Sequence, residues 1–86
     1  MTPDELLRRY PRETLRWLRR RLGVSQLDLA LDLGTDIGSV SRWETGRIPI
    51  GPRNRRRLAA LLASHLATPE GQAFARSLGR GEASEA

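Results

Sequence analysis

The sequence lacks cysteine and lysine altogether and contains a single histidine, His65. Without cysteine there is no disulfide, no thiol chemistry and no cysteine metal site. One histidine leaves almost no material for a metal centre or for general-base catalysis. No apolar run approaches the ~20 residues of a membrane span, and no signal-peptide core follows Met1. These absences predict a cytoplasmic protein that is not an enzyme, holds no metal or cofactor and has no membrane partner.

The positive charge is carried by one residue type. Fifteen arginines oppose ten carboxylates, which gives a net charge of +5 and a pI of about 11.4. Such an excess in a small domain is typical of a nucleic-acid-binding protein. A chain rich in arginine and without lysine also follows from a GC-rich genome, so the positions of the arginines must decide between the two explanations.

Apolar residues recur at helical spacing, and runs of alternating β-branched residues are missing. Proline, capping residues and glycine mark the expected helix ends. We therefore predict an all-α fold, a compact bundle of five to six short helices. The expected parts are an N-terminal helical extension at residues 1–11, a central domain at 12–66, a short C-terminal helix at 67–79 and a disordered tail at 80–86.

Two of the predicted helices, at about residues 26–33 and 37–45, are joined by the short sequence LGTD and so fit a helix-turn-helix. The stretch LRWLRRRLGVSQLDLALDLGTDIGSVSRWETGRIP resembles the lambda-repressor-like, Xre-type helix-turn-helix family over about residues 12–66. The residues that carry the resemblance are Gly23, Ser25, Gln26, Leu29, Ala30, Leu33, Gly34, Val40, Ser41, Trp43, Glu44 and Gly46.

The resemblance implies a role for individual positions. In such domains the second helix of the pair lies in the DNA major groove. Gln26 matches a residue that contacts phosphate and often a base, and Ile37, Gly38 and Arg42 match positions that face base edges. Ser41 and Arg47 match phosphate contacts. Arg19 and Glu44 match a pair that joins two helices, and Val40 and Trp43 match core positions.

Helical periodicity supports this division of the 37–45 helix. A helix that buries Val40 and Trp43 must expose Arg42 on its other side. An exposed arginine in a major groove donates two hydrogen bonds to guanine, a contact worth ~1–3 kcal/mol of discrimination. Ile37 suits a thymine methyl group. Gly38 costs ~1 kcal/mol in a helix interior, and its small size lets the backbone approach the groove.

Arginines also crowd the first turns of the helix expected to begin at residue 52, at Arg53, Arg55, Arg56 and Arg57. The helix dipole disfavours each cation there by ~0.3–1 kcal/mol at low salt. A bound anion offsets that cost, and helix N-termini are natural phosphate sites. We therefore expect Arg53, Arg55 and Arg56 to contact DNA phosphates. The alternative is a set of ordinary surface ion pairs with Asp32, Asp36 or Glu13.

Several apolar residues depart from the family pattern. Trp17, Leu27 and Leu31 stand where the family is commonly polar, and the N-terminal extension adds further apolar side chains. Either the extension or the last helix, which carries Phe74, packs on this surface within one chain, or the surface formed by Trp17, Leu27, Leu31 and Phe74 is a protein interface.

The predicted function is a sequence-specific double-stranded DNA-binding transcriptional regulator, a bacterial or phage repressor that binds as a homodimer to half-sites ~34–36 Å apart. The alternative is a protein-binding module, such as an antitoxin or a phage factor, whose partner is a toxin or a host enzyme, with or without DNA binding. RNA is a third and weaker candidate, because aromatic side chains for base stacking are scarce.

Overall fold

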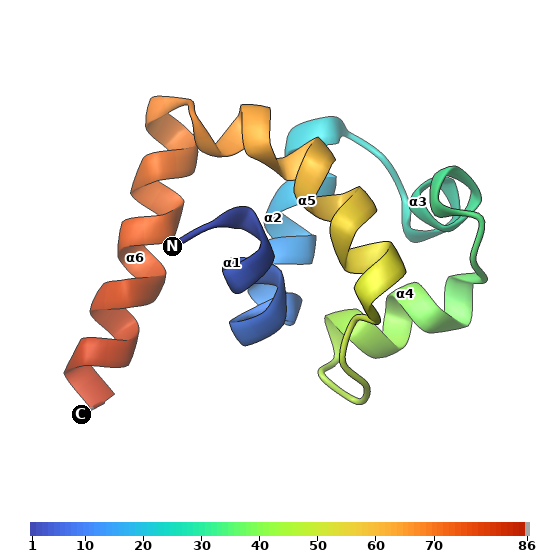
Figure 1. The fold of residues 1–86 in the computed structure, drawn as a ribbon, viewed down its shortest axis with the longest axis horizontal. Coiled ribbons are helices and arrows are strands. Elements are labelled where there is room, and N and C mark those ends of the chain that lie inside the picture. The colour runs from blue at the N-terminus through green and yellow to red at the C-terminus, as the bar shows by residue number, and fades with distance from the viewer. Residues whose placement is uncertain (86) are drawn as a thin grey trace.

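The computed structural model describes the backbone of residues 1–85, and these residues form six helices and no strand. In chain order they are α1 (Pro3–Arg9), α2 (Pro11–Leu22), α3 (Gln26–Leu33), α4 (Ile37–Glu44), α5 (Pro52–Leu66) and α6 (Pro69–Glu85) (Figure 1). The all-α bundle predicted from the sequence is thereby confirmed. No helix in this part of the chain is long and apolar enough to cross a membrane.

Short polar side chains fix where α1, α3 and α4 begin. The Thr2 hydroxyl accepts from the Glu5 amide, and Ser25 and Asp28 form a reciprocal capping box at the start of α3. The Asp36 carboxylate accepts from the Ser39 amide at 2.7 Å and so caps α4. Each cap satisfies an amide that would otherwise lack a partner in the first helical turn.

The turn between α3 and α4 depends on Gly34. This residue ends α3 in the left-handed conformation with φ of 67°, and its amide bonds back to Ala30 and Leu31. Only glycine adopts that conformation without a steric cost. Arg57 adds a second constraint, because its Nη1 donates to the Leu33 carbonyl at 2.9 Å. The last turn of α3 is therefore tied to α5.

The N-terminal extension belongs to the core. Leu6 and Leu7 on α1 have no exposed surface, and α1 packs on both α5 and α2. The Thr14 hydroxyl, itself buried, donates to the Leu6 carbonyl at 3.3 Å. The remaining core side chains come from α2 to α5 and the loop before α5: Leu15, Leu18, Leu29, Ala30, Leu33, Val40, Trp43, Ile50, Leu58 and Leu62.

The last helix covers part of the apolar surface predicted from the sequence. Trp17 on α2 stacks on Phe74 of α6, with ring centroids 4.8 Å apart and ring planes 8° from parallel. Gly71 makes this approach possible, because a Cβ atom there would collide with the His65 carbonyl and with the Leu66 backbone. Trp17 and Phe74 therefore cover one another within the chain.

The expected end of α6 differs from the observed one. The sequence predicts that Gly79 ends a short helix and that residues 80–86 are disordered, whereas the backbone is helical through Glu85. Gly79 does not adopt the left-handed conformation that ends a helix. Ala83 and Glu85 are good helix formers, and no proline follows to stop the helix. Residue 86 lies outside the described residues.

Candidate nucleic-acid interface

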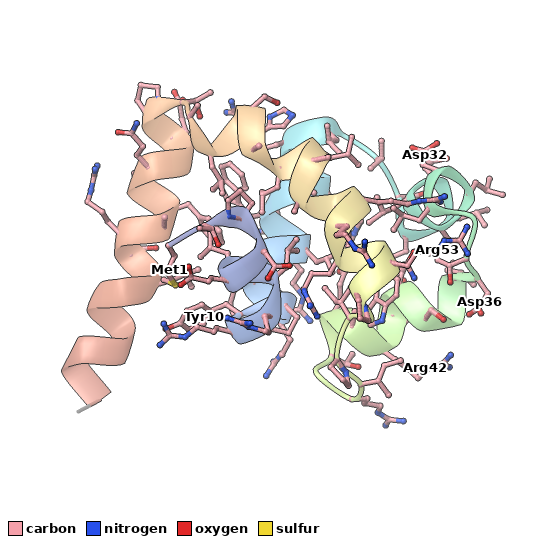
Figure 2. The ribbon with its side chains drawn as sticks, in the orientation of Figure 1. Met1, Tyr10, Asp32, Asp36, Arg42 and Arg53 are labelled. Carbon is pink, nitrogen blue, oxygen red and sulfur yellow. The ribbon has the colours of Figure 1, made fainter. Side chains whose placement is uncertain are left out.

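Helix α4 has one face in the core and one at the surface. Val40 and Trp43 are buried, whereas Ile37 is 48% exposed and Arg42 is also exposed. Figure 2 shows Asp36 and Arg42 at the end of the molecule that carries α3 and α4, with Met1 and Tyr10 on the side next to α6. The exposed face of α4 is therefore open to a large partner.

The C-terminal end of α4 is anchored to α2. Arg19 donates to Glu44 from Nε at 2.7 Å and from Nη2 at 2.8 Å, the pairing that the family resemblance implies. Its Nη1 also donates to the Val24 carbonyl at 3.2 Å, while Glu44 is only 2% exposed. The hydrogen bonds to Glu44 raise the pKa of Arg19. A planar guanidinium that makes all these bonds fixes the direction in which α4 points.

The N-terminal end of α4, by contrast, is exposed to solvent and carries no hydrogen-bonded arginine–carboxylate pair among the described residues. The amide of Ser39 lowers the pKa of the Asp36 carboxyl by donating to it, and the Ser39 hydroxyl donates to Oδ2 at 3.3 Å. Arg42 Nη2 lies 3.9 Å from Asp36 Oδ1, and the side chains of Arg42 and Asp36 are 48% and 71% exposed. This pair is too long for a hydrogen bond. The guanidinium remains able to donate to another acceptor.

The four arginines in the first turns of α5 fall into two groups. Arg55 donates from Nε to Asp4 Oδ1 at 2.7 Å and from Nη1 to the Ile50 carbonyl at 3.2 Å, so it holds α1 against the loop before α5. Arg57 donates to the Leu33 carbonyl at the end of α3. Arg53 and Arg56 are exposed, and Arg56 Nε makes only a long bond of 3.4 Å to the Pro52 carbonyl.

The other residues that the sequence analysis identified lie on α3, on α4 and in the loop after α4. Gln26, at the start of α3, and Ser41 are half-buried, and Arg47, just after α4, is exposed. Gly38 lies in the first turn of α4 beside Arg42. Leu27 and Leu31 on α3 are 52% and 70% exposed, so unlike Trp17 they are not covered by any side chain that the structure describes.

The sequence interpretation missed two arginines near the end of α4. Arg12 and Arg16 are exposed on α2, and Arg16 Nε lies 3.9 Å from Glu44 Oε1. The Arg12 side chain packs on Gly46, where a Cβ atom would lie 2.9 Å from Arg12 Cδ. Their four-residue spacing was a usable signal, because it places both on one face of a helix. With Arg47 they add positive charge beside α4.

The geometry of α3 and α4 defines the structural class of the protein. Two short helices joined by a tight turn, the second with an exposed face flanked by arginines, form a helix-turn-helix of the kind that docks in DNA. The chain belongs to the helix-turn-helix domain family, which it matches over residues 12–73. No curated protein and no solved structure matches it. Among the described residues, no group of His, Asp or Glu side chains could hold a metal ion.

Proposed function

We propose that this protein is a sequence-specific double-stranded DNA-binding transcriptional regulator that acts as a repressor. The observation that carries the proposal is the division of α4: Val40 and Trp43 hold it in the core while Ile37 and Arg42 face solvent. The major groove of B-DNA is wide enough for one such helix. A net charge of +5 supplies the long-range attraction to the phosphate backbone.

Arg42 is the principal reader of a base in this proposal. Its exposed guanidinium donates to O6 and N7 of a guanine, the most discriminating contact that one side chain makes in the major groove. Ile37 rests against a thymine methyl group. Gln26, at the N-terminus of α3, contacts a phosphate and an adjacent base edge.

The phosphate contacts come from exposed groups around α4. Arg47, Arg53 and Arg56 are exposed, and Ser41 on α4, which is half-buried, adds a hydroxyl donor. Arg55, also expected to hold a phosphate, is instead paired with Asp4, so we assign it to the fold. Arg12 and Arg16 take its place as phosphate contacts beside the C-terminal end of α4.

A single domain of this size makes few base contacts, so the proposal includes a homodimer. Two copies on half-sites ~34–36 Å apart double the number of base contacts and read a palindrome. Binding over a promoter would then exclude the polymerase, which is the simplest mechanism of repression.

The experiment begins with selection of duplexes from a random pool by the wild-type chain. The selected and scrambled duplexes are then titrated at two salt concentrations. Arg42→Ala should lower the preference for the selected duplex about tenfold. The matched control is Arg76→Ala, which removes the same charge from an exposed position on α6. If Arg42→Ala keeps the wild-type preference, the base-reading assignment is wrong.

One observation favours a second function, binding of a partner protein such as a toxin or a host enzyme. Leu27 and Leu31 are exposed and, being four residues apart, lie on one face of α3. Contiguous exposed apolar surface is common at protein interfaces. Leu31→Glu should abolish a stoichiometric complex recovered by pull-down while leaving DNA binding intact. A chain that stays a homodimer without a partner would count against this function.

A further inference from the structure

Gly38 and its neighbours form an arrangement that the base-reading roles do not explain. Built on the backbone of Gly38, a Cβ atom would lie 3.1 Å from Arg42 Nη1 and 3.0 Å from Asp36 Oδ1. Both distances are shorter than ordinary van der Waals contact. A Cβ atom at position 38 would therefore press on the Arg42 guanidinium and the Asp36 carboxylate, and both would have to shift by a few tenths of an ångström.

Helix geometry explains how Arg42 reaches this position. Positions 38 and 42 are four apart and lie on one face, and long side chains on a helix lean toward its N-terminus. The side chain of Arg42 thus runs back along α4 to the first turn. There its Nη2 faces Asp36 Oδ1 at 3.9 Å. In helix-turn-helix proteins this end of the recognition helix meets the base edges.

We propose that Asp36 is a positioning residue for Arg42, and that position 38 is glycine to leave room for the guanidinium. Both residues then determine base specificity through Arg42 without touching a base. This inference rests on the proposed function, and it assigns Gly38 a different role from the close backbone approach predicted from the sequence.

The physical benefit is preorganisation. An arginine side chain that samples many rotamers in the free protein loses conformational entropy when it binds DNA. A side chain that is already held in the bound rotamer loses less. Asp36 supplies the attraction that holds it, and the absent side chain of Gly38 supplies the space. The long separation from Asp36 leaves the Nη groups able to donate to guanine.

Asp36 also caps α4, so its two roles must be separated. Asparagine caps a helix about as well as aspartate but carries no charge to hold a guanidinium. Asp36→Asn therefore keeps the cap and removes the attraction. The matched control is Asp28→Asn, which removes the same charge from the capping box of α3.

The measurement is the ratio of affinities for the selected duplex and for the same duplex with the Arg42-dependent guanine replaced by adenine. We expect Asp36→Asn to lower this ratio about twofold to threefold, because the attraction within an exposed ion pair is weak. Asp28→Asn should leave it unchanged. Thermal melting of both variants checks that the fold persists. Equal ratios for the two variants would overturn the role of Asp36.

Gly38 is tested by Gly38→Ala, with Gly79→Ala as the control. Both glycines are helical, but a Cβ atom at Gly79 meets nothing within 4 Å. Gly38→Ala should lower the same ratio about threefold to tenfold without lowering the melting temperature. A ratio equal to that of Gly79→Ala would overturn the role of Gly38.

The outcomes distinguish this inference from the proposed function. If the wild-type chain selects no sequence, or Arg42→Ala leaves the ratio unchanged, both fail. If Arg42→Ala abolishes the ratio while Asp36→Asn and Gly38→Ala preserve it, base reading by Arg42 stands and only the positioning inference fails.

Discussion

The two ends of α4 each carry an arginine–carboxylate pair, and the two pairs differ in separation, hydrogen bonding and burial. At the C-terminal end, Arg19 and Glu44 are joined by bonds of 2.7 and 2.8 Å, and Glu44 is buried. At the N-terminal end, Arg42 and Asp36 stand 3.9 Å apart and are exposed. A guanidinium and a carboxylate are thus hydrogen-bonded and shielded at one end of α4, and separated and exposed to solvent at the other.

The difference shows how burial separates a structural role from a recognition role. A buried bidentate pair is costly to open, because removal of one partner leaves the other charge without compensation. An exposed pair gains little from its mutual attraction and can exchange it for a better acceptor. The anchored end of α4 therefore fixes the helix, and the open end is available to DNA.

The largest expected effect comes from the anchored end. Arg19→Met leaves the buried Glu44 carboxylate with only Arg16, 3.9 Å away, near it, which should lower the free energy of unfolding by about 2 kcal/mol. Urea unfolding followed by circular dichroism measures the change. Arg20→Met is the control, because Arg20 is exposed on the same helix. Equal loss of stability in the two variants would show that α4 is not anchored by this pair.

The first turns of α5 also contain one paired arginine, Arg55, and one exposed arginine, Arg53, and smaller changes in stability are expected there. Arg55→Ala breaks a partly exposed pair with Asp4 and should cost about 1 kcal/mol of stability. Arg53→Ala should leave stability unchanged but flatten the dependence of DNA affinity on salt by about one phosphate contact. Unfolding and salt titrations of both variants provide the two readouts. If Arg53→Ala lowers stability and Arg55→Ala flattens the salt dependence instead, the roles given to these two arginines are wrong.

The smallest expected effect is a weakening of the Asp36 cap at the N-terminal end of α4 in acid. The Ser39 amide lowers the pKa of Asp36 below its unfolded value. The stabilisation from this carboxylate is therefore present above about pH 4, the unfolded pKa, and is lost as pH falls through the folded pKa. In urea unfolding, the difference in stability between the wild type and Asp36→Ala, which lacks the cap, should be constant at neutral pH and shrink in acid. A difference independent of pH would contradict this account of the cap.

The sequence predicted the features that depend on local spacing. Periodicity and capping residues located the helix-turn-helix and separated Val40 and Trp43 from Arg42. The family resemblance supplied the pairing of Arg19 with Glu44, which lie 25 residues apart in the chain. Contacts of this kind cannot be derived from the spacing of residues along one helix.

The remaining features depend on contacts between distant segments and were not predictable. The sequence does not show that Arg55 would meet Asp4, 51 positions away, or that Arg57 would bond the end of α3. It left open whether Trp17 faced solvent or Phe74. It also could not show that Arg42 folds back over Gly38, because that depends on the rotamer of one long side chain.

In the proposed complex, Arg42 donates to the N7 and O6 atoms of one guanine. The most direct measurement replaces that guanine in the selected duplex with 7-deazaguanine, which lacks only the N7 acceptor, and compares affinities for the wild type and Arg42→Ala. The account predicts that the replacement weakens wild-type binding several-fold, by up to about tenfold, and leaves Arg42→Ala binding unchanged. Equal weakening of both proteins, or of neither, would contradict it.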